Sequence, residues 1–133
     1  MKKIYSKVEP EKLLAIYNST NEIGRNDLTD AKEILQVAVI HENKKMYRAH
    51  VHIPKKVDYF GVTQESMVVI KGQLRCYIYD LNDSIISILD LSQGECVINL
   101  AGGHNFEVME NDTLFYEFKT GPYNGQSQDK IFI

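Results

Sequence analysis

Three histidines and one glutamate are the residues of this chain best suited to chemistry. His50 and His52 are one residue apart in an alternating stretch, and Glu65 and His104 follow further along the chain. In an extended strand, side chains two positions apart project to the same face, so both imidazoles can reach one ion. Imidazole and carboxylate together suit Zn, Fe, Mn, Ni or Co rather than Ca or Mg. The pattern predicts a site for a divalent transition metal, with Gln64 as the neighbouring substitute should Glu65 not bind.

The composition fits one domain that binds neither nucleic acid nor a membrane. The 133 residues are enough for a single hydrophobic core. Fifteen Lys and Arg residues against 18 Asp and Glu residues give a net charge of −3, with the two signs interspersed. Because no basic stripe is present, we exclude nucleic acid and anionic membranes as primary partners and expect a small-molecule ligand.

The chain carries no recognisable export signal. Residues 1–8 lack the apolar region of a secretory signal, and no apolar run has the length of a membrane span. Cys76 and Cys96 are far apart and form no C-x-x-C pair, so we expect two small buried side chains in a reducing compartment. These features predict a cytoplasmic location.

The first quarter of the chain differs in pattern from the rest. Residues 9–18 predict a short amphipathic helix, because a proline and acidic residues begin the segment and apolar residues recur at helical spacing. We therefore assign residues 1–33 to an N-terminal helix and connecting loop that pack on the following domain. Residues 34–133 form that domain, which we expect to be a β-barrel.

From residue 34 onward the pattern is all-β. Short segments rich in apolar and β-branched residues are separated by turn signals that contain Gly, Asn or Asp. The expected strands are residues 34–40, 45–53, 65–71, 74–81, 84–91, 95–100, 104–109 and 113–119. About eight short strands in one domain predict a double-sheet jelly roll.

The strand with the two histidines has a second apolar face. If His50 and His52 point into the barrel, alternation places Met46 and Arg48 on the same face. The outward face then carries Tyr47, Ala49, Val51 and Ile53. An apolar outward face needs cover from the N-terminal helix, an added strand or a second subunit. We expect a homodimer.

The spacing of these motifs resembles that of the cupin superfamily. His50-x-His52, then Glu65 and, after six further residues, Gly72 resemble the first cupin motif, and the stretch from Gly94 to Gly102-Gly103-His104 resembles the second. Over about residues 33–133 the chain is similar to the small WbuC-type cupin fold metalloproteins, whose relatives are often associated with bacterial polysaccharide biosynthesis. The resemblance implies a double-stranded β-helix, or cupin jelly-roll barrel. It implies these metal ligands: His50, His52, Glu65 and His104.

The chain departs from the common cupin pattern in two places. Twelve residues lie between His52 and Glu65, where the common motif has only a few, so we expect an extra loop over residues 54–63 near the site entrance. In the second motif Leu100 stands where proline is usual, and the segment before His104 is one residue shorter.

Five further side chains are candidates for contact with a ligand. Glu117 and Lys119 share a strand face, and a buried pair at the barrel rim would tune the pKa of each partner. The alternative is a surface ion pair on an edge strand. The candidates for acid/base catalysis are Glu117, Lys119 and Tyr123, and those for substrate binding are Arg48 and Tyr116.

Such a site is compatible with more than one function. The first is a metal-dependent enzyme, an isomerase or epimerase or a dioxygenase, that acts on a small polar and possibly sugar-derived molecule. The second is a non-catalytic metabolite- or sugar-binding module that uses the metal as an anchor. A third is an ion that only stabilises the barrel, although structural metal sites are usually closed.

Overall fold

The computed structural model describes residues 2–6, 8, 10–11, 13–17, 22–30, 34–53 and 63–133. Its regular elements are antiparallel strands and one short helix. The strands are β1 (Lys2–Tyr5), β2 (Leu13–Tyr17), β3 (Gly24–Asp27), β4 (Leu35–Glu42), β5 (Lys45–Met46), β6 (His50–His52), β7 (Glu65–Lys71), β8 (Leu74–Tyr79), β9 (Ile85–Leu91), β10 (Cys96–Asn99), β11 (Gly103–Val108), β12 (Thr113–Thr120) and β13 (Lys130–Phe132). The helix α1 is Gln126–Asp129.

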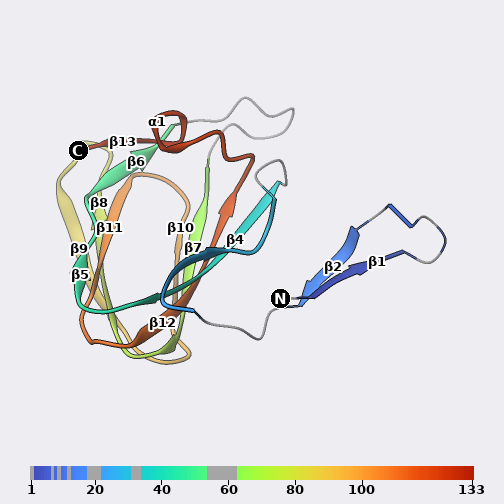
Figure 1. Cartoon of the computed structure of the whole chain (residues 1–133). Helices are drawn as coiled ribbons and strands as arrows, with labels where there is room; N and C mark the ends of the chain where they lie inside the picture. Colours follow the sequence, from blue (N-terminus) through green and yellow to red (C-terminus); the bar gives the residue numbers. More distant parts are fainter. Residues whose placement is uncertain are drawn as a thin grey trace.

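Two sheets face each other and form a barrel (Figure 1). One sheet has the order β10-β7-β12-β4-β3, and the other has the order β13-β6-β11-β8-β9, with β5 paired to β11. Apolar side chains from both sheets fill the space between them. They are Ala38, Ile40, Met67, Val69, Leu74, Cys76, Leu91, Phe106, Val108 and Phe115. The predicted all-β jelly roll is therefore confirmed.

The interior changes from apolar to polar along the strands. On β7, burial alternates so that Met67 and Val69 face the core, and Glu65 faces the same way at the start of the strand. β12 continues this change, because Phe115 lies in the core whereas Lys119 is buried opposite Glu65. The polar end of the barrel thus receives its charged groups from strand ends whose other residues hold the fold together.

One extra residue before His50 changes which side chains face inward. The pairing of Met46 and of His50 with β11 requires four steps along this segment but three along β11. Such a bulge shifts the alternation by one position. Tyr47, expected to face outward, therefore packs against the core, whereas Met46 is 53% exposed. The prediction that Met46 and Arg48 share the interior face with His50 is wrong for this reason.

The predicted N-terminal helix over residues 9–18 is wrong in its described part. Leu13–Tyr17 forms strand β2, which pairs with β1, and Figure 1 shows this hairpin extending away from the barrel. A helix of so few residues is marginal without packing, whereas cross-strand pairing satisfies the backbone here. The barrel sheet also begins earlier than residue 34, because β3 pairs with β4. None of the described helices is long and apolar enough to cross a membrane.

The two cysteines are in different environments. Cys76 is buried in the core, and burial raises the pKa of its thiol to about 12. Cys96 begins β10 at the edge of its sheet and is exposed, so the prediction that both cysteines are buried is wrong for Cys96. Alternation along a strand that is solvated on one side explains this difference.

Candidate metal centre

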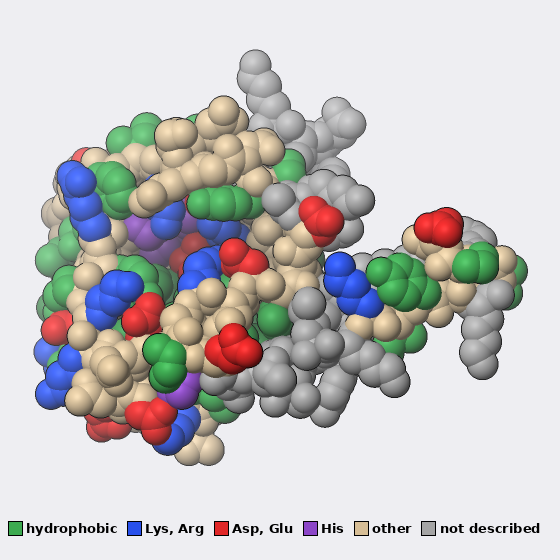
Figure 2. All heavy atoms as spheres, viewed as in Figure 1, with side chains coloured by type: hydrophobic (Ala, Val, Ile, Leu, Met, Phe, Trp, Pro, Cys, Tyr) green, Lys and Arg blue, Asp and Glu red, His purple; other side chains and the backbone are tan. Residues whose placement is uncertain are grey.

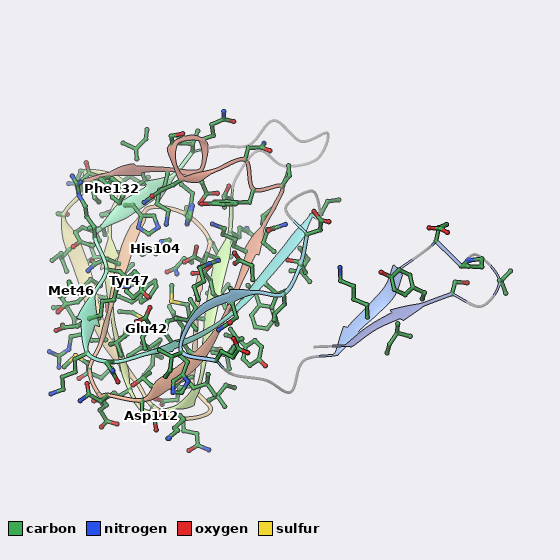
Figure 3. The ribbon with its side chains drawn as sticks, in the orientation of Figure 1. Glu42, Met46, Tyr47, His104, Asp112 and Phe132 are labelled. Atoms are coloured by element: carbon green, nitrogen blue, oxygen red, sulfur yellow. The ribbon has the colours of Figure 1, made fainter. Side chains whose placement is uncertain are left out.

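The four predicted ligands come together in the barrel. His50 and His52 lie on β6, and His104 lies on β11 directly opposite His50. Glu65 enters from β7 in the other sheet, so the site joins both layers. One possible ligand atom from each residue lies within 4.8 Å of those from the other three. Figure 3 shows His104 inside the barrel, below Phe132.

The three imidazoles form a compact triangle. Their ring centroids are 5.0 Å apart for His50 and His52, 4.7 Å for His50 and His104, and 5.2 Å for His52 and His104. The Nδ1 atom of His50 is 3.0 Å from the carbonyl oxygen of Arg48, to which it can donate. This bond leaves the Nε2 lone pair of His50 directed into the site.

A buried carboxylate holds the second imidazole. The Nδ1 atom of His52 lies 3.3 Å from the carbonyl oxygen of Asp129 and 3.3 Å from its Oδ2 atom. Asp129 is 1% exposed and forms an ion pair with Lys119, with 2.8 Å between Nζ and Oδ2. A carboxylate behind a histidine fixes the tautomer of a metal ligand and raises its basicity.

The inner ring nitrogens are short of hydrogen-bond partners. The Nε2 atoms of His50 and His52 are buried and have no hydrogen-bond partner within the described part of the chain. His52 Nε2 lies 3.0 Å from Glu65 Oε2 but without hydrogen-bond geometry, and His104 Nε2 lies 3.1 Å from Glu65 Oε1. Buried polar atoms without partners are costly, and a shared cation would satisfy them.

Burial and neighbours shift the titration of the site in opposite directions. Burial lowers the pKa of His50 to about 4. Burial also opposes the charge of His52, but the nearby carboxylates of Asp129 and Glu65 raise its pKa to about 9. Burial acts against ionisation of Glu65 as well, yet the histidine partners hold its pKa well below its usual range.

The residues present fit a divalent transition metal. Three imidazole nitrogens and one carboxylate match the ligand preferences of Zn, Fe, Mn, Ni and Co. A metal that takes more than four ligands would keep positions for water or a small molecule beside these four side chains. His50, His52, Glu65 and His104 would hold the ion, and the described residues thus support the predicted site.

The predicted pairing of Glu117 with Lys119 is replaced by two separate ion pairs. Both side chains are 6% exposed, so the alternative of a surface pair is wrong. Glu117 accepts from Arg25 Nη2 at 2.8 Å, because β3 brings that guanidinium to the same side of the sheet. Lys119 instead donates to Asp129, and its Nζ atom lies 4.6 Å from the ring centroid of Tyr123.

The two predicted substrate-binding residues lie in different places. Arg48 is exposed beside the site, with its guanidinium 4.2 Å from the ring centroid of Phe132, which pairs with His50. Tyr116 stacks on Phe118, with 6.1 Å between ring centroids, on the face of β12 opposite Glu117. The structure therefore brings Arg48 to the rim and does not bring Tyr116 to the metal ligands.

The C-terminal segment supplies site residues to which the sequence had led us to assign no role. β13 pairs with β6 so that Lys130 lies opposite His52 and Phe132 lies opposite His50. Asp129 reaches His52 from the end of α1. The alternation in Lys130–Phe132 is the one local signal for this strand, and it is too short to identify a partner strand.

A cavity opens beside the ligands. It has a volume of about 230 Å³ and borders His52 and His104. Its polar lining beyond these histidines is Thr63, Asp80, Asp83 and Asn99. Of the extra loop predicted over residues 54–63, residues 54–62 lie outside the described residues, and Thr63 is buried.

The barrel is similar to solved cupin proteins. It superposes on BH2720 from Bacillus halodurans with a TM-score of 0.62 and 18% identity, over 80% of this chain and 76% of that one. The TM-score is 0.56 for KdgF from Halomonas sp., with 13% identity over 72% of this chain and 76% of that one. It is 0.63 for oxalate decarboxylase from Bacillus subtilis, with 16% identity over 89% of this chain. The fold is a cupin fold.

These similarities concern the fold. This chain spans 30% of the oxalate decarboxylase chain, which is therefore much longer. No family model matches the chain, and no curated protein matches it. The cupin expectation is confirmed, whereas the WbuC-type subgroup stays a prediction.

Proposed function

We propose that this cupin-fold protein binds a divalent transition metal and, through it, acts on a small polar metabolite. The observation that carries the proposal is the buried cluster in which one ligand atom each from His50, His52, Glu65 and His104 lies within 4.8 Å of the others. When bound, a metal of this kind polarises ligand oxygens and lowers the pKa of a bound water. Zn, Fe, Mn, Ni and Co all suit the ligand set.

The cavity beside the site supports a ligand with several hydroxyl groups. Its lining offers a hydroxyl from Thr63, an amide from Asn99 and carboxylates from Asp80 and Asp83. The hydroxyl and the amide can donate hydrogen bonds to the hydroxyls of a sugar-derived molecule, and all of these groups can accept hydrogen bonds from them. Isomerisation, epimerisation or dioxygenation of such a molecule stays within this proposal, as do a role in bacterial polysaccharide biosynthesis and a cytoplasmic location.

A specific observation favours the alternative of a non-catalytic binding module. It concerns the three predicted acid/base candidates, which are Glu117, Lys119 and Tyr123. Glu117 is paired with Arg25, and Lys119 is paired with Asp129 and lies against the ring of Tyr123. A base already engaged in an ion pair is less ready to accept a proton from a ligand. In this alternative, the metal anchors a metabolite or sugar without turnover.

The metal site is tested by elemental analysis of the purified protein and three variants. His50→Ala and His104→Ala should lose most of the bound metal, because each removes one of four ligands. His41→Ala is the matched control, since His41 pairs with Asp112, which lies at the other end of the barrel from His104 (Figure 3). Equal metal content in all four proteins, or none in any, would contradict the proposal.

The two functions are separated by a substrate panel. Metal-loaded protein is incubated with keto sugars, nucleotide sugars and organic acids, with and without a chelator. Turnover that disappears on chelation supports the enzyme. A rise in melting temperature with a panel member but no turnover supports the binding module.

A further inference from the structure

We propose that Lys130 forms an anion-binding subsite next to the metal, so that the ligand of this protein carries a carboxylate or phosphate group. The inference rests on the proposed metal site and adds the charge of the ligand to it.

Strand pairing places Lys130 on the wall of the site. Lys130 lies directly opposite His52 in the antiparallel pair of β13 and β6. Directly opposed residues of an antiparallel pair project to the same face of the sheet. His52 faces Glu65 inside the barrel, so Lys130 projects from the same wall.

The surroundings of Lys130 are buried and charged. It is half-buried, and burial lowers the pKa of its ammonium group. Glu65 counteracts this shift, and the nearby cation Lys119 adds to it. In Figure 2, His, Lys or Arg, and Asp or Glu side chains lie together in a hollow of the molecule, which agrees with a polar barrel mouth.

The other charged groups near Lys130 already have partners. Arg25 pairs with Glu117 at 2.8 Å, and Lys119 pairs with Asp129 at 2.8 Å. For Lys130, the described residues provide no hydrogen bond or ion pair to its Nζ atom. Without a metal, Glu65 is the carboxylate that raises the pKa of Lys130 most.

Metal binding takes up the charge of Glu65, the carboxylate that acts most strongly on Lys130. A divalent ion bound by neutral imidazoles takes the charge of Glu65 and still has one positive charge in excess. Lys130 adds a second positive charge on the same wall. Two partly desolvated positive charges favour an anionic ligand, because an unpaired buried charge is costly. An oxygen-rich anion can bind the metal through one group and accept from the ammonium group through another.

The test compares ligands that differ in charge. Metal-loaded wild-type protein, Lys130→Gln, Lys130→Arg and Lys44→Gln are titrated calorimetrically with D-gluconate, D-glucitol and inorganic phosphate. Gluconate and glucitol have the same carbon chain and differ at the carboxylate. Lys44→Gln removes the same charge from an exposed position and serves as the matched control. Metal content is measured in every sample before and after titration.

We expect wild-type protein to bind at least one of the two anions more tightly than glucitol. Lys130→Gln should weaken binding of that anion about tenfold, which corresponds to the loss of one charged contact, and Lys130→Arg should restore most of it. If binding of gluconate depends on Lys130, the ligand carries a carboxylate. If only binding of phosphate depends on Lys130, the ligand is phosphorylated. Lys44→Gln should behave as wild type.

Two results would overturn the subsite. The first is that metal-loaded wild-type protein binds glucitol as tightly as both anions, or binds neither anion. This comparison uses only the wild-type protein, so it does not depend on whether a variant folds. The other is Lys130→Gln that retains metal and binds both anions like Lys44→Gln. A wild-type protein that takes up no metal instead contradicts the proposed function, and the metal measurement distinguishes the two failures.

Discussion

At the scale of single residues, two histidines on one short strand have opposite acid–base behaviour. His50 Nδ1 meets a backbone carbonyl, and burial lowers the pKa of the ring to about 4. His52 Nδ1 meets Asp129 instead, and despite burial the carboxylate partners raise the pKa of this ring to about 9. The partner of the outer ring nitrogen therefore decides which histidine carries a proton in the metal-free protein.

Metal binding at pH 7 should release about one proton. At this pH, below the pKa of about 9, His52 is protonated, whereas His50 is neutral because pH 7 is above its pKa of about 4. A metal binds neutral imidazole, so the His52 proton must leave, and affinity should rise with pH towards 9. Calorimetry in buffers of different ionisation enthalpy measures the release. Binding that is independent of pH between 6 and 9 would contradict this assignment.

Asp129→Asn should weaken metal binding by about 10- to 100-fold. The variant keeps the size of the side chain but removes the charge that orients His52 and pairs with Lys119. Asp90→Asn is the control, because Asp90 is exposed and pairs with Arg75 on the surface. Metal titration monitored by calorimetry checks the difference. Equal affinities for the two variants would show that Asp129 does not position His52.

At the scale of elements, the site depends on where strands are interrupted. The bulge between β5 and β6 lets Tyr47 complete the core while His50 still faces the site. β13 then pairs with β6 along its whole length, from His50 to His52. A strand of three residues is too short to be stable alone, so β6 depends on its two neighbours, β11 and β13.

The turn between β7 and β8 should tolerate no side chain at Gly72. A Cβ there would lie 2.9 Å from Thr113 Cα, and φ is +80°. Gly94 is the matched control, with φ of +85° and no atom within 4 Å of an added Cβ. Gly94→Ala should cost about 1 kcal/mol from backbone strain. Gly72→Ala should cost about 2 kcal/mol more because of overpacking. Urea unfolding measures both, and equal costs would contradict the close approach.

At the scale of the whole molecule, the surface carries many large apolar side chains. Leu35, Ile86 and Ile98 are more than half exposed, and Ile86 and Ile98 lie on edge strands of the two sheets. Edge strands with apolar side chains favour association with another chain. The outward row first expected to drive association is partly covered instead, since Val51 and Ile53 are half-buried.

The protein should be a homodimer in solution. A symmetric pair would remove exposed apolar side chains on both sheets from contact with water, and this burial of apolar surface favours association. Size-exclusion chromatography with light scattering gives the mass directly, for comparison with 15.3 kDa for one chain. A monomer at micromolar concentration would contradict this prediction.

The sequence by itself determined the β-barrel and the four candidate ligands. Strand alternation and turn residues are local signals. The two histidines of a His-x-His pair on a strand lie on the same face, independently of the rest of the chain. It also placed Glu117 and Lys119 on one face of a strand, but it left open whether that face is buried or on the surface, and the structure shows that both side chains are buried.

Only the tertiary structure decided which residues support those ligands. The bulge before His50, the pairing of β13 with β6, and the partners of Glu117 and Lys119 all depend on contacts between segments far apart in the chain. Residues 13–17 satisfy a helical pattern, yet they pair as a strand, because a short segment takes its conformation from its partner rather than from its own periodicity. Local preference is worth little energy for each residue, and long-range pairing outweighs it.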